Sequence, residues 1–342
     1  MNEARILVGD VRESLRGLPD GAVRCVVTSP PYWGLRDYGN DGQIGLEQTP
    51  DEYVAEMIGV FREVRRVLAD DGTLWLNLGD SYAAARGGST PPAETLAGGV
   101  NGWMPDGKRV NRDRKDGYNP SRNAPAIGLK HKDLVGIPWR VAFALQADGW
   151  YLRQDIIWAK PNPMPESAKD RCTKAHEYVF LLTKQPRYYY DNDAIREEPK
   201  LDKRTATNKT PVEMNEKDVE RMLMAKGIWG GNQMSKPRGA MYRGYDEVKG
   251  ANRRSVWSIN SKGFKGAHFA VMPEALVEPC VLAGSATGDT VLDPFSGSGT
   301  VGVVALRHGR NYIGCELNPN YAAISEERIR EDAPLMNTVV VA

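Results

Sequence analysis

Short apolar runs recur near both ends of the chain, and most are bounded by turn residues. Because the runs are short and rich in β-branched residues, they predict buried strands. Helical patterns separate them, and strands that alternate with helices are typical of an α/β fold. The expected strands are residues 6–8, 23–27, 73–78, 289–293 and 311–315, and the expected helices include 11–17, 273–282 and 301–308.

The clearest helix signal begins at Thr49. Thr49 is a cap residue, Pro50 fits the first helical position, and Glu52 completes a capping box. Apolar residues then recur at helical spacing and predict a core-facing stripe of Tyr53, Met57, Phe61, Val64 and Leu68. The turn at 70–72 is expected to end this helix.

The middle of the chain predicts a helix followed by two strands. An amphipathic helix is expected from Asp133 onward and carries Trp139, Val141, Phe143 and Leu145. Residues 151–158 and 177–183 are expected to pair as an antiparallel hairpin that closes one edge of the sheet. Residues 254–259 return to a strand-like pattern.

Two long segments, 83–130 and 197–254, lack this periodicity. The first is rich in Gly, Pro, Asn and Arg and is expected to be a loop. Residues 199–254 hold 13 Lys and Arg against 7 Asp and Glu, and residues 106–133 hold 8 against 4. Basic residues with interleaved aromatic ones suit contacts to nucleic-acid phosphates and bases, and solvated segments without a ligand are the alternative.

Composition narrows the class of protein. The chain has 342 residues, a net charge of +1 and enough length for a large core. Its four cysteines show no zinc-type spacing, and Cys25, Cys280 and Cys315 lie in apolar runs that predict buried thiols. No apolar segment suits a signal peptide or a membrane span. We therefore expect a soluble, cytoplasmic protein of a reducing compartment, with neither a metal nor a membrane partner.

The strand at 23–27 leads into the turn Thr28-Ser29-Pro30-Pro31-Tyr32-Trp33. Two successive prolines cannot continue a strand ladder, so the chain leaves the sheet there in a rigid extended loop. In open α/β sheets, ligands bind at the carboxyl ends of the strands. The turn therefore suits a planar ring stacked on Tyr32, with an amino group held by the Ser29 hydroxyl and the Pro30 carbonyl. An ordinary strand-ending turn is the alternative.

A second candidate site follows the strand at 289–293. The next turn contains Gly297 and Gly299 and precedes a helix, which is the form of a nucleotide cradle. Glu316 ends the following strand, 19 residues after Gly297, where such folds hold a ribose diol. The turn lacks a third glycine and a Walker lysine. These features favour S-adenosylmethionine over a ligand with a pyrophosphate.

Together, the two turns resemble motifs of the DNA amino-methyltransferases. Residues 28–32 resemble the catalytic motif of this family, and residues 293–300 resemble its cofactor motif. The catalytic motif comes first, which is the order of the β class, a circular permutation of the usual fold. Further matches are residues 72–80, 157–162 and 268–273, so the resemblance covers most of the chain outside 83–130 and 197–252.

The resemblance implies an α/β fold: a circularly permuted, Rossmann-like class I methyltransferase sheet with helices on both faces and an inserted target-recognition region. The implied parts are residues 1–82 and 133–196 for the catalytic half, 83–132 for a flexible basic insert, 197–254 for target recognition and 255–342 for the cofactor half. The implied catalytic residues are Ser29, Pro30, Pro31 and Tyr32. The implied S-adenosylmethionine site comprises Asp10, Thr28, Phe269, Asp293, Phe295, Gly297, Ser298, Gly299, Thr300 and Glu316. Asp10 also suits a helix cap, and Phe269 also suits core packing.

The implied activity is site-specific methylation of double-stranded DNA at the exocyclic amine of a flipped base. Family members with Ser before Pro-Pro are mostly cytosine-N4 enzymes, so Ser29 favours cytosine N4 over adenine N6. An RNA methyltransferase and a nucleic-acid-binding module without chemistry are the alternatives. Candidate DNA contacts are Trp33, Arg112, Arg114, Lys160, Asn162, Arg253 and Arg254, and a cognate restriction endonuclease is a candidate partner.

Overall fold

The computed structural model describes residues 2–35, 40, 42–83, 128–197, 250–261, 271–332 and 337–342. The chain divides into two compact units, one formed by Met1–Ile195 with Arg254–Ala342 and the other by Arg196–Arg253. In the second unit, Glu197 and Ala251 form an isolated antiparallel bridge. Most of the two aperiodic segments lies outside the described residues, and so do the candidate site residues Arg112, Arg114 and Phe269.

The first unit is built on a mixed sheet, whose strand order within the described residues is β6-β4-β5-β3-β2-β7-β8-β1-β9. Neighbouring strands are parallel except at β5, which is antiparallel to both β3 and β4. The strands are β1 (Asn2–Val8), β2 (Val23–Thr28), β3 (Leu68–Leu78), β4 (Tyr151–Ala159), β5 (His176–Thr183), β6 (Val256–Ser258), β7 (Thr290–Asp293), β8 (Asn311–Glu316) and β9 (Asn337–Val341).

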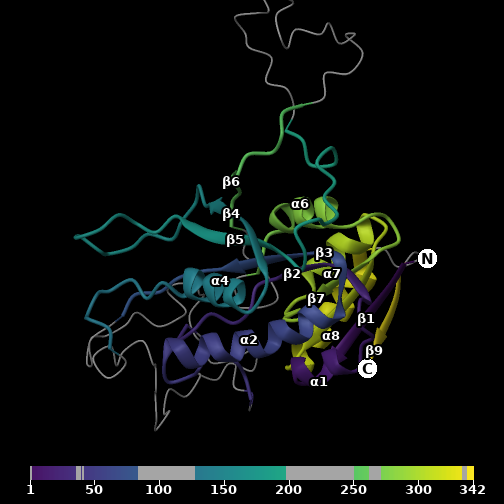
Figure 1. Cartoon of the computed structure of the whole chain (residues 1–342), viewed down its shortest axis with the longest axis horizontal. Helices are drawn as coiled ribbons and strands as arrows, with labels where there is room; N and C mark the ends of the chain where they lie inside the picture. The colour runs from purple at the N-terminus through teal and green to yellow at the C-terminus, as the bar shows by residue number, and fades with distance from the viewer. Residues whose placement is uncertain are drawn as a thin grey trace, which may run out of the picture. The chain divides into compact units, whose positions relative to one another are not determined.

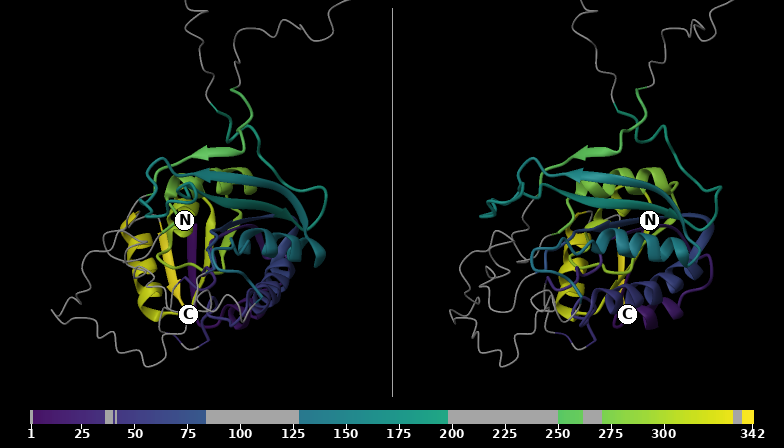
Figure 2. Two further views of the ribbon diagram at one scale, coloured as in Figure 1. Left: turned by 90° about the vertical axis from the view of Figure 1, so that its left-hand side faces the viewer. Right: turned by 60° about the vertical axis from the view of Figure 1, so that its left-hand side comes forward.

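Helices cover both faces of this sheet (Figures 1 and 2). One core packs α1 (Val11–Arg16), α2 (Pro50–Val67) and α4 (Ile137–Ala147) against one face, and the other packs α6 (Glu274–Gly284), α7 (Thr300–Arg307) and α8 (Pro319–Asp332) against the other. Successive strand residues alternate between the two cores, since Leu74 and Leu76 belong to the first and Trp75 to the second. The expected α/β sheet with helices on both faces is confirmed.

Two strands that lie far apart in the sequence are neighbours at the centre of the sheet. Cys25 and Val26 of β2 pair in parallel with Val291 and Leu292 of β7. The helix that follows β2 packs on one face, and α7, which follows β7, packs on the other. The chain therefore departs in opposite directions from two adjacent strand ends, and such a switch point opens a crevice in a parallel sheet.

The sequence predicted the elements better than their ends. The capping box at Thr49 and Glu52 is present, but α2 ends at Val67 and the turn at 70–72 lies within β3. The helix expected from Asp133 begins at Ile137, and Phe143 on it is 55% exposed. β4 and β5 do form an antiparallel hairpin, but β6 pairs with β4 and forms the edge instead.

Two elements, α8 and β9, were not predicted at all, although β9 pairs with β1 at the opposite edge. The expected buried thiols are confirmed, because Cys25, Cys280 and Cys315 are buried while Cys172 is exposed. None of the helices in the described ranges combines the length and hydropathy that a membrane crossing requires.

Candidate functional site

A cavity of about 280 Å³ opens where four parallel strands end. Its wall includes residues that directly follow β1, β2, β7 and β8, so both sequence motifs contribute to it. Sequence-predicted residues on the wall are Asp10, Ser29, Pro30, Pro31, Tyr32, Lys160, Asp293, Phe295, Gly297, Ser298, Thr300 and Glu316. The structure therefore places the two turns around one cavity rather than at two separate sites.

A buried hydrogen bond joins the two turns. The Thr28 hydroxyl donates to Oδ1 of Asp293 at 2.6 Å, and the backbone N–H of Phe295 donates to the same oxygen at 3.0 Å. Thr28 and Asp293 are 0% and 1% exposed. Burial raises the pKa of Asp293 to about 7, because removal from water disfavours its charged form.

The proline turn is fixed from two sides. The Tyr53 hydroxyl, on α2, donates to the Pro31 carbonyl at 2.9 Å. The Tyr32 ring lies against Gly79, where an added Cβ would come within 2.5 Å of the ring. Gly79 therefore leaves the space that the Tyr32 ring occupies, and a larger residue there would displace the ring.

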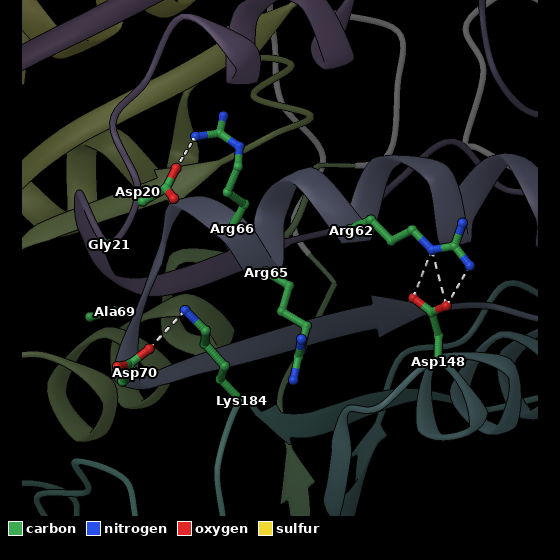
Figure 3. A pocket seen from close by; sticks show the side chains of 9 residues that line it. All are labelled: Asp20, Gly21, Arg62, Arg65, Arg66, Ala69, Asp70, Asp148 and Lys184. Carbon is green, nitrogen blue, oxygen red and sulfur yellow. Dashed lines mark hydrogen bonds and ion pairs between the residues drawn. The ribbon is translucent and has the colours of Figure 1, made fainter.

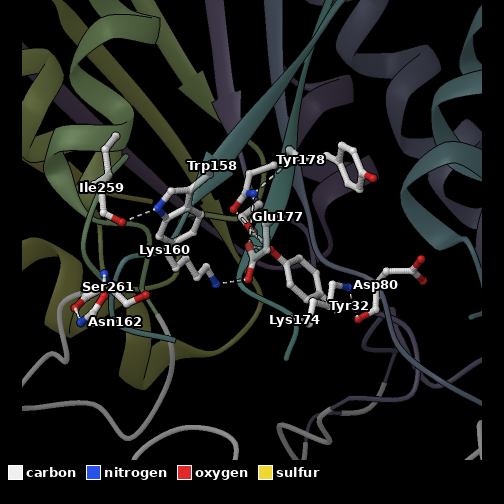
Figure 4. A network of polar contacts seen from close by, with 12 residues as sticks. Tyr32, Asp80, Trp158, Lys160, Asn162, Lys174, Glu177, Tyr178, Ile259 and Ser261 are labelled. Atoms are coloured by element: carbon white, nitrogen blue, oxygen red, sulfur yellow. Dashed lines mark hydrogen bonds and ion pairs between the residues drawn. The ribbon is translucent and has the colours of Figure 1, made fainter. Parts of the chain in front are cut away.

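The Tyr32 hydroxyl lies at the centre of a polar network (Figure 4). It donates to Oε2 of Glu177 at 2.7 Å and lies 3.2 Å from Oδ1 of Asn77, while the Ser29 hydroxyl donates to it at 3.3 Å. Glu177 also forms an ion pair with Lys160. Burial and the neighbouring Glu177 charge raise the pKa of Tyr32 well above 10, so its phenol keeps its proton.

Sequence reasoning missed Asn77 and Glu177 as site residues. Each is a polar residue in a largely apolar strand, Asn77 in β3 and Glu177 in β5. That departure from the apolar pattern was the available signal. Their meeting with Tyr32, 45 and 145 residues away, follows only from the order of the strands.

The glycine turn and the acidic residue of the next strand bind each other directly. The N–H of Gly297 donates to Oε2 of Glu316 at 2.8 Å, and the N–H of Asn318 donates to Oε1 at 2.9 Å. Burial raises the pKa of Glu316. Gly299 has φ +74°, and an added Cβ would lie 2.2 Å from Oγ of Ser325, so the turn requires glycine there.

Arg328 on α8 also binds the glycine turn. Sequence reasoning missed this residue because α8 was not predicted. Its Nη1 donates to the Ser298 carbonyl at 2.6 Å, to Ser298 Oγ at 2.9 Å and to Thr300 Oγ1 at 3.2 Å. Burial lowers the pKa of Arg328. The turn is thus fixed both by Glu316 and by this guanidinium.

Asp10 both caps a helix and lies on the cavity wall, and the sequence suggested both roles. Its side chain caps α1 by accepting from the N–H groups of Arg12 at 2.8 Å and Glu13 at 3.3 Å, and it also lies on the cavity wall. Burial favours a higher pKa for Asp10, but the hydrogen bonds and charge of Arg12 outweigh it and lower the pKa.

The candidate DNA contacts have different environments. Trp33 is a correction: it is 1% exposed and its Nε1 donates to the Glu47 carbonyl at 3.0 Å, so it packs in the core with no surface for DNA. Asn162 pairs with the backbone of Ser261 through bonds of 2.9 and 3.0 Å. Arg253 is partly exposed and Arg254 is exposed.

A second hollow, of about 740 Å³, lies at the other end of the strands (Figure 3). It is lined by residues that precede β2, begin β3 and follow β5. Its charged side chains form the ion pairs Arg66–Asp20, Arg62–Asp148 and Lys184–Asp70. None of the sequence-predicted site residues lines this hollow, so the smaller cavity is the candidate functional site.

Comparisons with known proteins point to one family. A sequence model of the N6_N4_Mtase family, described as DNA methylase, matches residues 23–327. The chain is 46% identical to the Type II methyltransferase M.Cfr9I of Citrobacter freundii over 336 residues, which cover 96% of this chain and 89% of that protein. It is also 46% identical to the Type II methyltransferase M.SmaI of Serratia marcescens over 332 residues, which cover 96% and 91%.

Solved structures share the fold. The chain superposes on TTHA0409 of Thermus thermophilus, a proposed DNA modification methylase complexed with S-adenosyl-L-methionine, with a TM-score of 0.54 at 23% identity, covering 98% and 99% of the two chains. It superposes on the PvuII DNA methyltransferase (cytosine-N4-specific) with a TM-score of 0.56 at 18% identity, covering 100% and 95%. These similarities assign the sheet to the class I methyltransferase fold.

Proposed function

Because the chain belongs to the N6_N4_Mtase family of DNA methylases, whose members use S-adenosyl-L-methionine, we propose that it methylates N4 of a cytosine flipped out of duplex DNA. That it is an S-adenosylmethionine-dependent DNA amino-methyltransferase follows from the family. The choice of base and the roles of individual residues are the proposal. The observation that carries it is the single cavity shared by Ser29, Tyr32 and Glu316.

The residues on one side of the cavity fit the cofactor. The Glu316 carboxylate accepts one backbone N–H at each oxygen, which leaves acceptor capacity for the two hydroxyls of a ribose. The left-handed Gly297 and Gly299 bring backbone close to the cavity, and the buried Asp293 suits a positively charged group. When bound, S-adenosylmethionine supplies an electrophilic methyl group on a sulfonium.

The residues on the other side fit a flipped base. The Tyr32 ring is a stacking surface, and stacking on aromatic side chains is worth about 1–3 kcal/mol per base. This stacking offsets part of the free-energy cost of flipping a base out of a duplex, which is roughly a few kcal/mol. Ser29 Oγ and the Pro30 carbonyl would each accept a hydrogen bond from the exocyclic amine. These bonds would take the nitrogen lone pair out of conjugation with the ring and direct it toward the cofactor side.

Orientation then accounts for much of the rate enhancement. A nitrogen held about 3–3.5 Å from the carbon that it attacks is in a near-attack geometry. The chain's part is to hold the amine in place, to exclude water and to accept hydrogen bonds from the amine at Ser29 Oγ and the Pro30 carbonyl. The nitrogen carries a surplus proton once it has gained the methyl group, and that proton would pass to solvent. This reaction needs no covalent bond between the enzyme and the base.

Ser29 supports cytosine as the target base. The residue before Pro-Pro in this chain is Ser, as in most of the cytosine-N4 enzymes that it resembles, whereas adenine-N6 enzymes usually have Asp there. A solved protein of the same fold is described as cytosine-N4-specific. N6 of adenine is the competing target, because its amine presents the same two hydrogens to Ser29 and Pro30.

The relatives also support a site-specific role. They are Type II methyltransferases, which belong to restriction-modification systems, so we propose that this enzyme protects a defined duplex sequence from a cognate endonuclease. Target recognition is proposed for residues 197–254, where basic residues outnumber acidic ones and Arg253 and Arg254 lie at the end. Residues 83–132 are proposed as a second basic segment near DNA.

Nucleoside mass spectrometry tests the proposal. Unmethylated duplex DNA of varied sequence would be incubated with the protein and S-adenosylmethionine, digested and analysed, and the modified sequence would be mapped. N4-methylcytosine is the expected product. N6-methyladenine would overturn the choice of base but keep the site, and modification of RNA alone would overturn DNA as the substrate.

A further inference from the structure

The Tyr32 hydroxyl has one proton and three polar neighbours. Glu177 Oε2 is the nearest at 2.7 Å, whereas Asn77 Oδ1 and Ser29 Oγ lie at 3.2 and 3.3 Å. A hydrogen bond to an ionised acceptor is shorter and stronger than one between neutral groups. The phenol proton therefore belongs to the bond with Glu177.

Glu177 is held as an acceptor by its other contacts (Figure 4). Its Oε1 pairs with the Lys160 ammonium, which also lies 4.2 Å from the centre of the Trp158 ring. The Asn77 amide donates to Oε2 at 3.3 Å and to the Tyr178 carbonyl at 3.0 Å. The side chains of Glu177 and Lys160 are only 16% and 20% exposed, so water competes little for these bonds.

This arrangement fixes the direction of the Ser29 hydroxyl. A serine hydroxyl can donate or accept, but in the proposed reaction Ser29 must accept a hydrogen from the amine of the base. Since the proton of Tyr32 points to Glu177, the phenol oxygen can accept, and the Ser29 hydroxyl donates to it. The lone pairs of Ser29 Oγ are then left for the substrate.

We infer that Glu177 is a positioning residue: it aligns the chain Ser29 to Tyr32 to Glu177 so that Ser29 presents an acceptor, not a donor, to the exocyclic amine. This inference rests on the proposed role of Ser29. It assigns a function to an acidic residue of β5 that lies on the cavity wall and acts through the Tyr32 hydroxyl rather than on the reacting atoms. Lys160 supports it by pairing with the far oxygen of the same carboxylate.

Glu177→Gln reverses this polarity while it keeps the shape of the side chain. The Lys160 ammonium, a charged donor, would hold the amide oxygen more strongly than the neutral Asn77 amide does at 3.3 Å, and the amide NH₂ would turn toward Tyr32. The NH₂ would donate to the phenol oxygen, and the Tyr32 proton would move to Asn77. The Ser29 hydroxyl would lose its acceptor and become free to point its proton at the amine.

The first test compares Glu177→Gln with the wild-type full chain on the mapped duplex site. We expect kcat to fall about 10- to 100-fold, less than the roughly 100- to 1000-fold lost when a group that contacts the reacting atoms is removed. The KM for DNA and the Kd for S-adenosylmethionine, measured by calorimetry, should stay within about twofold. Equal losses in kcat and in cofactor affinity, or an unchanged kcat, would overturn the inference.

Asp148→Asn is the matched control. The Asp148 side chain is also 16% exposed and also pairs with a cation, Arg62, but it lies at the second hollow rather than at the cavity. It should leave kcat unchanged. A fall in kcat equal to that of Glu177→Gln would show that loss of any such ion pair suffices, and would overturn the inference.

A double-mutant cycle tests whether Glu177 acts through the Tyr32 hydroxyl. Tyr32→Phe keeps the ring but removes the hydroxyl, so adding Glu177→Gln should then change kcat by no more than about twofold. If the loss of kcat in the double variant instead equals the product of the two single losses, Glu177 acts by another route and the inference fails. If Ser29→Ala keeps full turnover, the proposed role of Ser29 fails and the inference with it; if only Glu177→Gln is silent, the inference alone fails.

Discussion

The two sides of the cavity are held together in different ways. On the side proposed for the cofactor, Glu316 and Arg328 fix the glycine turn through contacts that span 19 and 30 residues. On the side proposed for the base, Tyr32 depends on Asn77 and Glu177, which are 45 and 145 residues away. The proposed cofactor side is therefore built from contacts within about 30 residues, whereas the proposed base side requires strands β3 and β5, far apart in the sequence, to come together beside Tyr32.

This difference predicts that the two sides can be disabled separately. The largest effect is expected from Ser29→Ala, which removes a proposed acceptor of the amine, and from Tyr32→Ala, which removes the proposed stacking surface. Turnover should fall at least about 100-fold. The Kd for S-adenosylmethionine should change little, because the hydrogen bonds of the two side chains run to each other and on to Asn77 and Glu177, and Glu316 binds the glycine turn instead. Calorimetry together with a methyl-transfer assay measures both, and undiminished methylation by either variant would remove the proposed site.

The converse change is Glu316→Ala. It removes an acceptor proposed for the ribose and also leaves the N–H groups of Gly297 and Asn318 without their partner. A hydrogen bond to a charged group contributes about 1.5–3 kcal/mol, so cofactor affinity should fall about 10- to 100-fold. Glu316→Gln keeps one acceptor oxygen and should lose less. Turnover at saturating cofactor should remain close to wild type, and a loss in kcat alone would contradict the separation of the two sides.

The sequence predicted the glycine-turn side of the cavity better than the side around Tyr32, although it missed Arg328 on α8. The glycine turn and Glu316 were found because each lies next to a strand whose apolar pattern is clear. Asn77 and Glu177 were missed as site residues, since nothing in the sequence states that β3 lies between β2 and β5. Trp33 was misassigned to DNA for a related reason: the turn beside Tyr32 directs it into the core, where Glu47 accepts its Nε1–H.

Edge strands show the same limit. The hairpin of β4 and β5 was predicted because the two strands follow one another in the sequence, but the pairing of β6 with β4 joins residues about a hundred positions apart. The parallel pairing of β9 with β1 joins the two ends of the chain. Local patterns define elements, and long-range pairing, which decides what meets at the cavity, is set by packing of the complete sheet.

A smaller effect should distinguish the fixed glycine turn from an ordinary left-handed turn. Gly299 (φ +74°) and Gly288 (φ +89°) both need left-handed backbone, but an added Cβ meets Ser325 Oγ at 2.2 Å only at Gly299, and nothing within 4 Å at Gly288. Gly288→Ala should cost about 1–2 kcal/mol in the free energy of unfolding for the backbone alone. Gly299→Ala should cost roughly 1–3 kcal/mol more because of overpacking. Urea unfolding compares them, and equal costs would show that the turn is not tightly held by α8.

The smallest effect concerns the bond that joins the two sides. The pKa of Asp293 is raised to about 7 by burial, so part of the protein carries a protonated Asp293 at neutral pH. A positively charged ligand favours the carboxylate, and binding below pH 7 therefore releases a proton. Affinity for S-adenosylmethionine should rise with pH by at most about tenfold per unit below pH 7 and level off above it.

Two variants make that dependence specific. Asp293→Asn cannot ionise and should flatten the profile between pH 6 and 8. Thr28→Val removes the hydroxyl that donates to Asp293 at 2.6 Å and that lowers its pKa, so the midpoint of the profile should move to higher pH. Calorimetric titrations at several pH values measure both. If the affinity of Asp293→Asn for S-adenosylmethionine still depends on pH, the released proton comes from another group, such as Glu316. The Thr28–Asp293 bond would then have no part in cofactor binding.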